Sequence, residues 1–289
     1  MSLILVTGAA GKTGQKVVSA LASHNADIRA FVRREEAGEA MKSLGAAEVF
    51  VGDFFERGSL EAAIDGCAQV IHICPPMNPR EADLARLITD LCKAGGVERL
   101  ILYSALHPLL RGVRHHALKL DAEQYLVESG QPYTILQPCR YMQHLTPIWK
   151  NVVESGVHAM PFSIDAKFSV TDLNDVAEAA ALVATEDGHE GATYELAGPD
   201  QLSQVDMARI ISSVIGKPIR AETKSPEDYC RAAEAAGMSA DRIKNLVSMN
   251  EHYDSHGLIG NSNVLRWILG REPTNFATFV ERDLKPQIK

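Results

Sequence analysis

The stretch VTGAAGKTG, from Val6 to Gly14, decides the fold of this chain. Its glycines at positions 8, 11 and 14 stand between an apolar run typical of a strand and a segment of helical period. In that setting the first glycine permits a tight turn, the second lets a pyrophosphate approach the backbone, and the third lets the helix pack closely. The N–H groups at the helix start then bind phosphate. The stretch predicts a dinucleotide-binding loop, against the alternative of a glycine turn without a ligand.

The first half of the chain alternates between short β-branched runs and segments of helical period. The runs expected to form strands are SLILVT, ADIRAFV, EVFVG, QVIHIC, RLILYS and YTILQ, and the helical segments include KTGQKVVSALAS and READLARLITDLCKA. Strict alternation indicates βαβ units, a parallel sheet and helices on both of its faces. The near-continuous apolar character of the strands agrees with a sheet covered on both sides. We therefore predict an α/β fold with a Rossmann-type doubly wound parallel sheet.

After Pro138 the alternation weakens. Helices are expected around 146–156 and 172–185, followed by a strand in ATYELAG and a mostly helical remainder. Ser203 and Asp206 have the spacing of a capping box, and Ser225 with Pro226 begins another helix. We predict a dinucleotide-binding core over residues 1–150, to which about 166–200 returns. A smaller, mostly helical substrate or cap region is expected over 151–289.

The bulk composition is that of a soluble globular protein. The chain has 289 residues, 46% of them hydrophobic and 23% charged, and a net charge of -8. That balance disfavours direct nucleic-acid binding, which needs clustered Lys and Arg. The sequence has no apolar run of membrane-spanning length and no basic signal-peptide start, and its five cysteines form no C-x-x-C pair. We expect a reduced, cytoplasmic protein that binds a small molecule and no metal.

Two arginines end the second expected strand, in AFVRREE. A carboxylate at this strand end would bind an adenosine ribose and favour NAD, whereas a guanidinium suits a 2'-phosphate. Arg33 and Arg34 occupy the position, and Lys12 in the glycine loop adds positive charge. We therefore predict NADP(H) in preference to NAD(H). The alternative is a solvated basic turn, offset by Glu35 and Glu36.

The ends of the third and fourth expected strands border the same predicted site. Asp53, in VGDFFERGSL, fits an acceptor for the adenine edge with Phe54 beside the ring, or else a turn aspartate. HICPPMN places Cys74 and Pro75 in a stiff loop beside the nicotinamide ribose. We interpret Cys74 as a packing residue rather than a nucleophile, because no partner base is apparent in the sequence.

Together these motifs resemble one known group. The stretches VTGAAGKTG, FVRR, GDF, LYSA and YTILQPCRYMQH, then FSVTDLNDVAEA, TYELAGPDQLS and LGREPTNFATFV, look like the NmrA-like group of the atypical short-chain dehydrogenase/reductase superfamily. That group includes NADPH-dependent quinone reductases, triphenylmethane-dye reductases, isoflavone-reductase-like enzymes and redox-sensing regulators. The resemblance covers nearly the whole chain, and it implies the fold and the cofactor rather than the substrate.

The resemblance also suggests catalytic positions. The main branch of the superfamily uses Y-x-x-x-K on the helix after the fifth strand, with a Ser or Thr near that strand's end. Ser104 matches the serine and Lys119 the lysine, while the tyrosine position falls on His115, so the usual proton donor is missing. The resemblance favours Lys119 as a ribose anchor over a solvated lysine paired with Glu123. His115 is either a proton donor or an exposed helix-start residue.

The predicted binding residues divide between cofactor and substrate. We expect His116 to lie at the surface, 100° around the helix from His115. His252 and His256 have metal-ligand spacing without a third ligand, which favours a plain loop. The residues predicted to line an apolar substrate pocket, with core packing as an equal alternative, are Tyr141, Met142, His144, Trp149 and Phe162. The predicted cofactor contacts are Thr7, Gly8, Gly11, Lys12, Thr13, Gly14, Arg33, Arg34, Asp53, Phe54, Cys74, Pro75, Lys119 and Pro138.

Three functions remain open on this basis. The leading hypothesis is an NADP(H)-dependent oxidoreductase that transfers a hydride to a small aromatic or quinone-like acceptor. The intact cofactor motif beside a missing tyrosine equally suits a redox sensor that binds NADP(H) and signals to a protein partner. The third candidate is a biosynthetic tailoring reductase or isomerase. A homodimer is compatible with each of the three.

Overall fold

The computed structural model describes residues 2–288 of the chain. They form two compact units. The first unit comprises residues 2–111, 116–137 and 174–194, and the second comprises 112–115, 138–173 and 195–288. Among the described residues, no helix has both the length and the apolar character needed to cross a membrane.

A seven-stranded sheet organises the first unit, in the order β10-β6-β5-β4-β1-β2-β3. Neighbouring strands from β3 to β6 pair in parallel. The strand bounds are β1 Leu3–Val6, β2 Asp27–Val32, β3 Glu48–Val51, β4 Gln69–His72, β5 Arg99–Tyr103, β6 Tyr133–Pro138 and β10 Ala192–Leu196. The strand order reverses between β1 and β4, and at such a switch point the carboxyl ends of the strands leave a crevice for a ligand. The predicted Rossmann-type sheet is confirmed.

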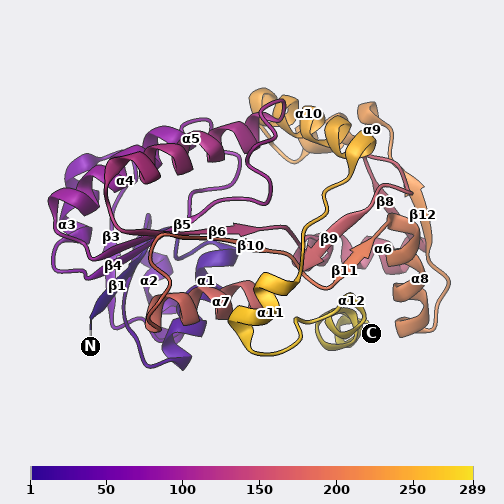
Figure 1. Cartoon of the computed structure of the whole chain (residues 1–289). Coiled ribbons are helices and arrows are strands. Elements are labelled where there is room, and N and C mark those ends of the chain that lie inside the picture. The colour runs from indigo at the N-terminus through magenta and orange to yellow at the C-terminus, as the bar shows by residue number, and fades with distance from the viewer. Residues whose placement is uncertain (1, 289) are drawn as a thin grey trace. The chain divides into compact units, whose positions relative to one another are not determined.

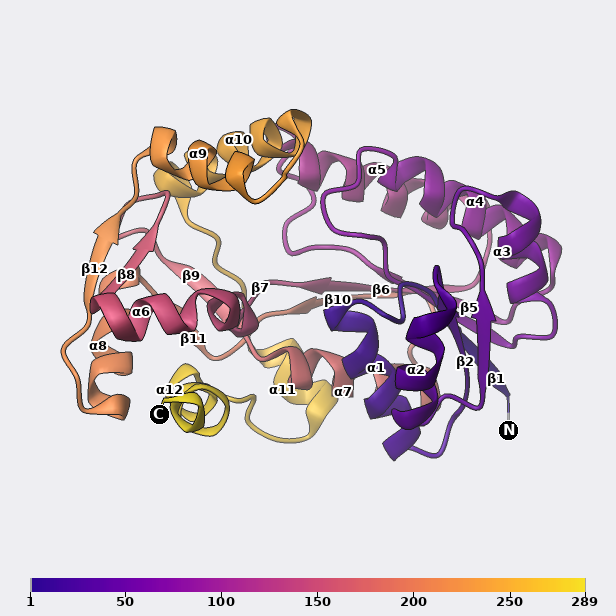
Figure 2. The same cartoon turned by 180° about the vertical axis from the view of Figure 1, so that it is seen from behind.

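Helices cover both faces of this sheet. In Figure 1 and Figure 2, α3, α4 and α5 lie on one face, and α1, α2 and α7 lie on the other. Their bounds are α1 Lys12–Ser23, α2 Gly38–Ser43, α3 Arg57–Ile64, α4 Glu81–Ala94, α5 Arg114–Ser129 and α7 Leu173–Thr185. Apolar side chains of α3 and α4, such as Leu60 and Ile88, pack with Leu5 and Leu100 of the sheet in one buried cluster. Burial of such side chains is the main term that stabilises the layers.

The second unit contains two small sheets and several helices. Its sheets are β11-β9-β7 and β12-β8. Its strands are β7 Arg140–Tyr141, β8 Val157–Met160, β9 Phe168–Thr171, β11 Asp200–Leu202 and β12 Arg220–Thr223. Its helices are α6 Trp149–Ser155, α8 Gln204–Ile215, α9 Pro226–Ala235, α10 Ala240–His256, α11 Asn263–Leu269 and the short α12 Phe276–Phe279, with a 3-10 turn, η2, over Met142–Ile148. β12 lies in the tail that the sequence indicated as mostly helical, and it forms because β8 supplies a parallel partner.

Local capping signals in the second unit are as predicted. Ser203 and Asp206 form a reciprocal capping box at the start of α8. Ser225 caps α9, whose first residue is Pro226.

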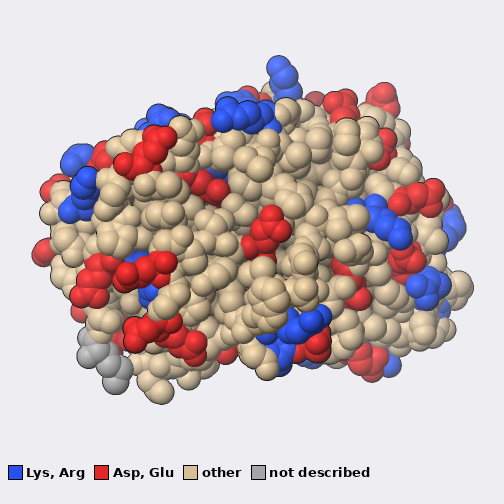
Figure 3. Space-filling model, viewed as in Figure 1, with Lys and Arg blue, Asp and Glu red and all other residues tan. Residues whose placement is uncertain are grey.

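Acidic and basic side chains are interspersed over the face of the molecule seen in Figure 3.

Candidate functional site

The glycine loop between β1 and α1 has no room for side chains at two positions. Gly8 has a φ of +66°, and a Cβ there would lie 2.4 Å from the Ile73 carbonyl oxygen. A Cβ on Gly14 would lie 2.3 Å from the Gly8 carbonyl oxygen. The first glycine therefore allows the turn, and the third allows α1 to approach the loop, as the motif predicts.

The N-terminus of α1 has no side-chain cap among the described residues. Gly11 is the N-cap residue, and no side chain accepts a hydrogen bond from the first turn. That turn also has no acidic residue. The first N–H groups of a helix lack partners inside the helix and carry partial positive charge, so a helix start of this kind suits an anion.

A buried histidine that the sequence analysis did not select ties β4 to β1. The Nδ1 atom of His72 lies 2.8 Å from the Thr7 hydroxyl oxygen, which also accepts a hydrogen bond from the Ile73 N–H at 3.2 Å. Burial, and then the nearby charge of Lys119, lower the pKa of His72 to about 3, so this ring stays neutral. The Thr7 hydroxyl is therefore already used to join the two strands at the switch point. The only sequence signal for His72 is a titratable residue in the apolar run QVIHIC.

The basic residues predicted to select NADP(H) are exposed. Arg33 and Arg34 directly follow β2, and Lys12 is the first residue of α1. Within the described part of the chain, none of the three forms an ion pair with an acidic side chain. Their charges are thus not neutralised internally.

Asp53 and Phe54 follow β3. The Asp53 carboxylate accepts a hydrogen bond of 2.8 Å from the Phe55 N–H, which is the turn role weighed as its alternative. Phe54 packs edge-on against Phe31, with ring centroids 5.3 Å apart, and its ring lies 6.1 Å from that of His72. One oxygen of Asp53 is therefore committed to the turn, and Phe54 is half-buried beside the core.

Lys119 is buried, being only 8% exposed. Its ammonium pairs with the Glu81 carboxylate at the start of α4 and donates a hydrogen bond of 2.7 Å to the Tyr103 carbonyl oxygen at the end of β5. The alternative of a solvated lysine is therefore wrong. Sequence reasoning did not identify Glu81, because its partner lies 38 positions away along the chain.

A second buried carboxyl group lies on the same helix. Glu123 accepts two hydrogen bonds from the Gln137 amide, at 2.9 and 3.0 Å, and its carboxyl lies beside the Ser104 hydroxyl. Burial raises the pKa of Glu123, and the hydrogen bonds and the charge of Lys119 oppose that rise. Ser104 is itself 6% exposed, just past the end of β5. The predicted serine and lysine thus belong to one buried polar network of the first unit.

The loop after β4 contains Cys74 and Pro75, both half-buried. Burial, and then the charge of Glu81, raise the pKa of the Cys74 thiol to about 12. The thiol is therefore neutral at physiological pH, which agrees with a packing residue rather than a nucleophile.

Two histidines begin α5. His115 lies in its first turn and is half-buried. The prediction for His116 was wrong: it is 1% exposed, and its Nδ1 lies 2.9 Å from the His107 carbonyl oxygen. The buried face of α5 consists of His116, Lys119, Ala122, Glu123 and Leu126, and the polar groups on it explain why hydrophobicity did not reveal which side faces inward.

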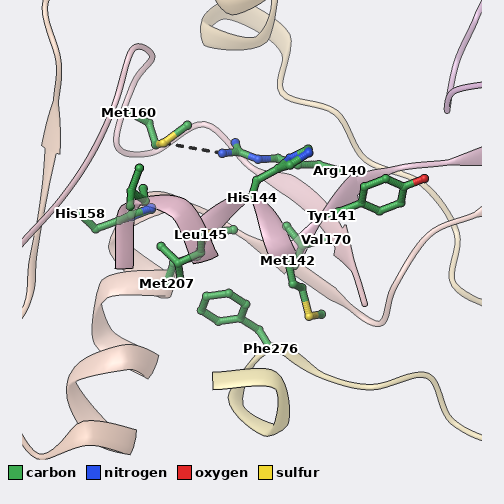
Figure 4. A pocket seen from close by; sticks show the side chains of 11 residues that line it. Arg140, Tyr141, Met142, His144, Leu145, His158, Met160, Val170, Met207 and Phe276 are labelled. Atoms are coloured by element: carbon green, nitrogen blue, oxygen red, sulfur yellow. Dashed lines mark hydrogen bonds between the residues drawn. The ribbon is translucent and has the colours of Figure 1, made fainter. Parts of the chain in front are cut away.

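In the second unit, a pocket opens beside β7, β8 and η2. Tyr141, Met142 and His144 line it, together with other side chains that include Arg140 and Phe276 (Figure 4). Trp149 and Phe162 do not line this pocket; both are 3% exposed and packed inside the unit. Pro138 is the buried last residue of β6.

The histidine pair near the C-terminus corrects a further expectation. His252 and His256 lie in α10 rather than in a loop, and their rings stack with centroids 4.5 Å apart. The described residues contain no group of three or more His, Cys, Asp or Glu side chains that would hold a metal ion.

Comparisons with known proteins extend over 96% of the chain. It is 27% identical to an NAD(P)H azoreductase of Xenophilus azovorans over 283 residues, covering 96% of this chain and 97% of that one. It is 27% identical to quinone oxidoreductase 2 of Escherichia coli, covering 96% and 97%. The crystal structure of the Escherichia coli NADPH-dependent quinone oxidoreductase complexed with NADPH superposes with a TM-score of 0.84, covering 96% of this chain and 98% of that one.

A family model matches nearly the whole chain. Residues 1–281 match the model of the NmrA-like family. The match spans the glycine loop, the buried network around Lys119 and the pocket of the second unit. The protein is therefore a member of the NmrA-like family, as the sequence motifs indicated.

Proposed function

We propose that this protein is an NAD(P)H-dependent oxidoreductase that prefers NADP(H) and reduces a small aromatic or quinone-like acceptor. The observation that carries the proposal is the N-terminus of α1. It follows a glycine loop at the switch point of the sheet, and no side chain caps it. The names of the azoreductase and quinone oxidoreductase relatives support the same reaction class. In this proposal the first unit binds the nucleotide and the second unit provides the acceptor pocket.

The residues of the first unit fit a dinucleotide. Gly8 and Gly14 leave backbone where any side chain would clash, and Gly11 exposes the first turn of α1 to a pyrophosphate. Arg33 and Arg34, with Lys12, would bind a 2'-phosphate, because their charges have no acidic partner among the residues that the structure describes and a guanidinium matches phosphate geometry. A cofactor without that phosphate would leave the two arginines unused.

Lys119 would hold the nicotinamide ribose. An ammonium group has three N–H donors. One is directed to Glu81 and one to the Tyr103 carbonyl, so a third remains for a ribose hydroxyl. When bound, the nicotinamide supplies the hydride, and the protein's contribution is to orient the two reactants and exclude water. His115, at the tyrosine position of the superfamily, or a water molecule would deliver the proton to the reduced acceptor.

Direct binding tests the cofactor assignment. We expect NADPH to bind more tightly than NADH in calorimetry, and the double variant Arg33→Ser/Arg34→Ser to bind NADPH roughly ten- to a hundredfold more weakly, the loss expected for charge-assisted hydrogen bonds. Its NADH affinity should change little. Arg57→Ser, at an exposed arginine of the same unit, is the matched control and should leave both affinities unchanged. Equal affinities for NADPH and NADH in the wild type would contradict the preference.

Turnover tests the reaction. NADPH oxidation is followed with a panel of benzoquinones, naphthoquinones and azo dyes, and we expect saturable turnover with at least one class. His115→Phe should lower the rate if the imidazole delivers the proton, without a matching change in NADPH affinity. Tight NADPH binding without turnover on any acceptor would overturn the oxidoreductase proposal and favour the redox-sensing role.

A further inference from the structure

The pocket of the second unit combines apolar and thioether surfaces with one cation. Met142, Met160, Met207 and Phe276 supply apolar and thioether walls, and Arg140 lies along one side (Figure 4). The cavity itself has a volume of about 20 Å³, which is room for about one water molecule. A larger ligand therefore has to move the flexible methionine side chains aside to enter. Its lining residues all belong to the second unit, so its chemistry is defined by that unit alone.

Arg140 has no acidic partner among the described residues. One terminal nitrogen of its guanidinium lies 3.7 Å from the Met160 sulfur, drawn as a dashed line in Figure 4. The group also lies over the rings of Phe162 and Phe168, at 5.2 and 5.4 Å from their centroids. A thioether is a weak acceptor and an aromatic face accepts no strong hydrogen bond, so most of the five N–H donors are left for another partner.

The charge of Arg140 persists in this setting. Burial lowers the pKa of the Arg140 guanidinium to about 10, which still leaves it charged at physiological pH. Burial in turn raises the pKa of Tyr253 to about 12, so the phenol is neutral at physiological pH and does not cancel the charge. By contrast, Arg282 of the same unit pairs with both Asp172 and Asp283. Arg140 is thus a cation held in place and not neutralised by the protein.

A second polar group of the pocket is also not satisfied. The Nδ1 atom of His158 is buried and has no hydrogen-bond partner among the described residues. Burial, and then the charge of Arg140, lower the pKa of His158 to about 4, so the ring is neutral at physiological pH. A neutral imidazole beside a guanidinium adds a hydrogen-bonding site without adding charge.

We propose that this pocket binds the acid group of a small organic acid, with Arg140 receiving the carboxylate and the methionines and Phe276 receiving an apolar or aromatic body. A guanidinium fork matches a carboxylate in two parallel hydrogen bonds, and the fixed position of Arg140 reduces the entropy lost on binding. Methionine side chains adapt to apolar ligands of different shape. This ligand class deepens the proposed function, on which it rests for the identity of the acceptor: an aromatic acceptor that carries a carboxylate fits both. The binding itself involves residues of the second unit alone and can be tested without turnover.

Methionine-methyl NMR tests the proposal on the full chain without cofactor, with benzoate and its neutral isostere benzamide as probes. We expect benzoate to shift the methyl signals of Met142, Met160 and Met207 saturably, and to leave Met41, buried in the first unit, unmoved. Benzamide should bind at least about tenfold more weakly, since a charge-assisted bond is worth more than a neutral one.

Variants test whether Arg140 causes the preference for benzoate over benzamide. Arg140→Leu should bring the benzoate and benzamide dissociation constants to within about twofold of each other, and Arg140→Lys should keep part of the difference. Arg209→Leu, at an exposed arginine of α8, is the matched control and should keep all of it. Equal binding of the two probes by the wild type, a benzoate shift of Met41 together with the pocket methyls, or an unchanged preference in Arg140→Leu would each overturn the proposal. If Arg140→Leu does not fold, the wild-type arms decide, and none of these outcomes depends on NADPH turnover.

Discussion

Two cations inside this protein have opposite surroundings. In the first unit, Lys119 lies against the Glu81 carboxylate and the Tyr103 carbonyl, so the protein itself balances its charge. In the second unit, Arg140 lies against a thioether and two aromatic rings, and no carboxylate of residues 2–288 pairs with it. Because a buried charge is costly unless it is paired, the charge of Lys119 is balanced by Glu81, whereas the half-buried Arg140 has no anion beside it among the described residues.

The starts of two helices repeat this contrast. The first turn of α8 is closed by the Ser203 and Asp206 capping box, whereas the first turn of α1 begins at Gly11 with no side-chain cap. Replacing a Ser, Thr, Asn or Asp N-cap by alanine typically lowers stability by about 1 kcal/mol, whereas replacing it by glycine costs only about a few tenths of a kcal/mol. We propose ligands at the start of α1 and at Arg140, where the described residues supply no side-chain cap and no carboxylate. Lys119 is balanced by Glu81 and, in the proposed function, offers only its remaining N–H to a ribose hydroxyl.

Removing the partner of the balanced cation should have the largest effect. Glu81→Ala leaves Lys119 buried beside a carbonyl alone, and we expect it to lower the free energy of unfolding by about 3–5 kcal/mol. Urea denaturation measures this loss. Glu39→Ala breaks an exposed pair with Lys42 and should cost less than about 0.5 kcal/mol. Similar losses in the two variants would mean that the burial of the Lys119 pair does not matter.

Acid should weaken the second unit through the histidine beside Arg140. The pKa of His158 is about 4 in the folded protein, below its ordinary value of 6.5, so the unfolded chain takes up the proton first as the pH falls. Its contribution to stability is present above pH 6.5 and is lost between pH 6.5 and about 4, a loss of about 3 kcal/mol. His158→Phe should remove that part of the acid sensitivity in urea denaturation at pH 7 and pH 4. His72, with a pKa of about 3, contributes equally in both proteins. An unchanged difference between the two pH values would refute the assignment.

The smallest effect is expected at the unbalanced cation. Arg140→Leu removes a charge that no carboxylate in the described part of the chain compensates, and it keeps an apolar side chain against Phe162 and Phe168. The relief of desolvation offsets the lost cation–π contacts, so the free energy of unfolding should stay within about 1 kcal/mol of the wild type. Thermal and urea unfolding at pH 7 check this. A loss as large as that of Glu81→Ala would show that Arg140 is a structural residue, and the contrast between the two cations would disappear.

Sequence patterns among neighbouring residues correctly predicted the main secondary-structure elements of the first unit and two helix caps of the second. The glycine loop, the alternation of strands and helices, and the Ser203 and Ser225 caps all involve residues close together in the chain, and each appears where expected. Two predictions were wrong. His116 was placed at the surface but is buried, with its ring against the His107 carbonyl oxygen of the preceding loop, and His252 and His256 were placed in a loop but lie in α10. The sequence also did not identify β12, because its partner strand β8 lies far away along the chain.

The sequence by itself determined the sheet, the glycine turn and the family, because hydrophobic periodicity and short motifs are properties of neighbouring residues. Ser104 and Lys119 could be identified in the same way, from their positions in the superfamily motif. Only the tertiary structure decided that Lys119 is balanced by Glu81, that His72 joins β4 to β1, and that Arg140 lies against a thioether and two aromatic rings. Whether a charge is paired depends on which distant side chains burial brings within hydrogen-bonding reach, and no local pattern in a single sequence encodes that distance.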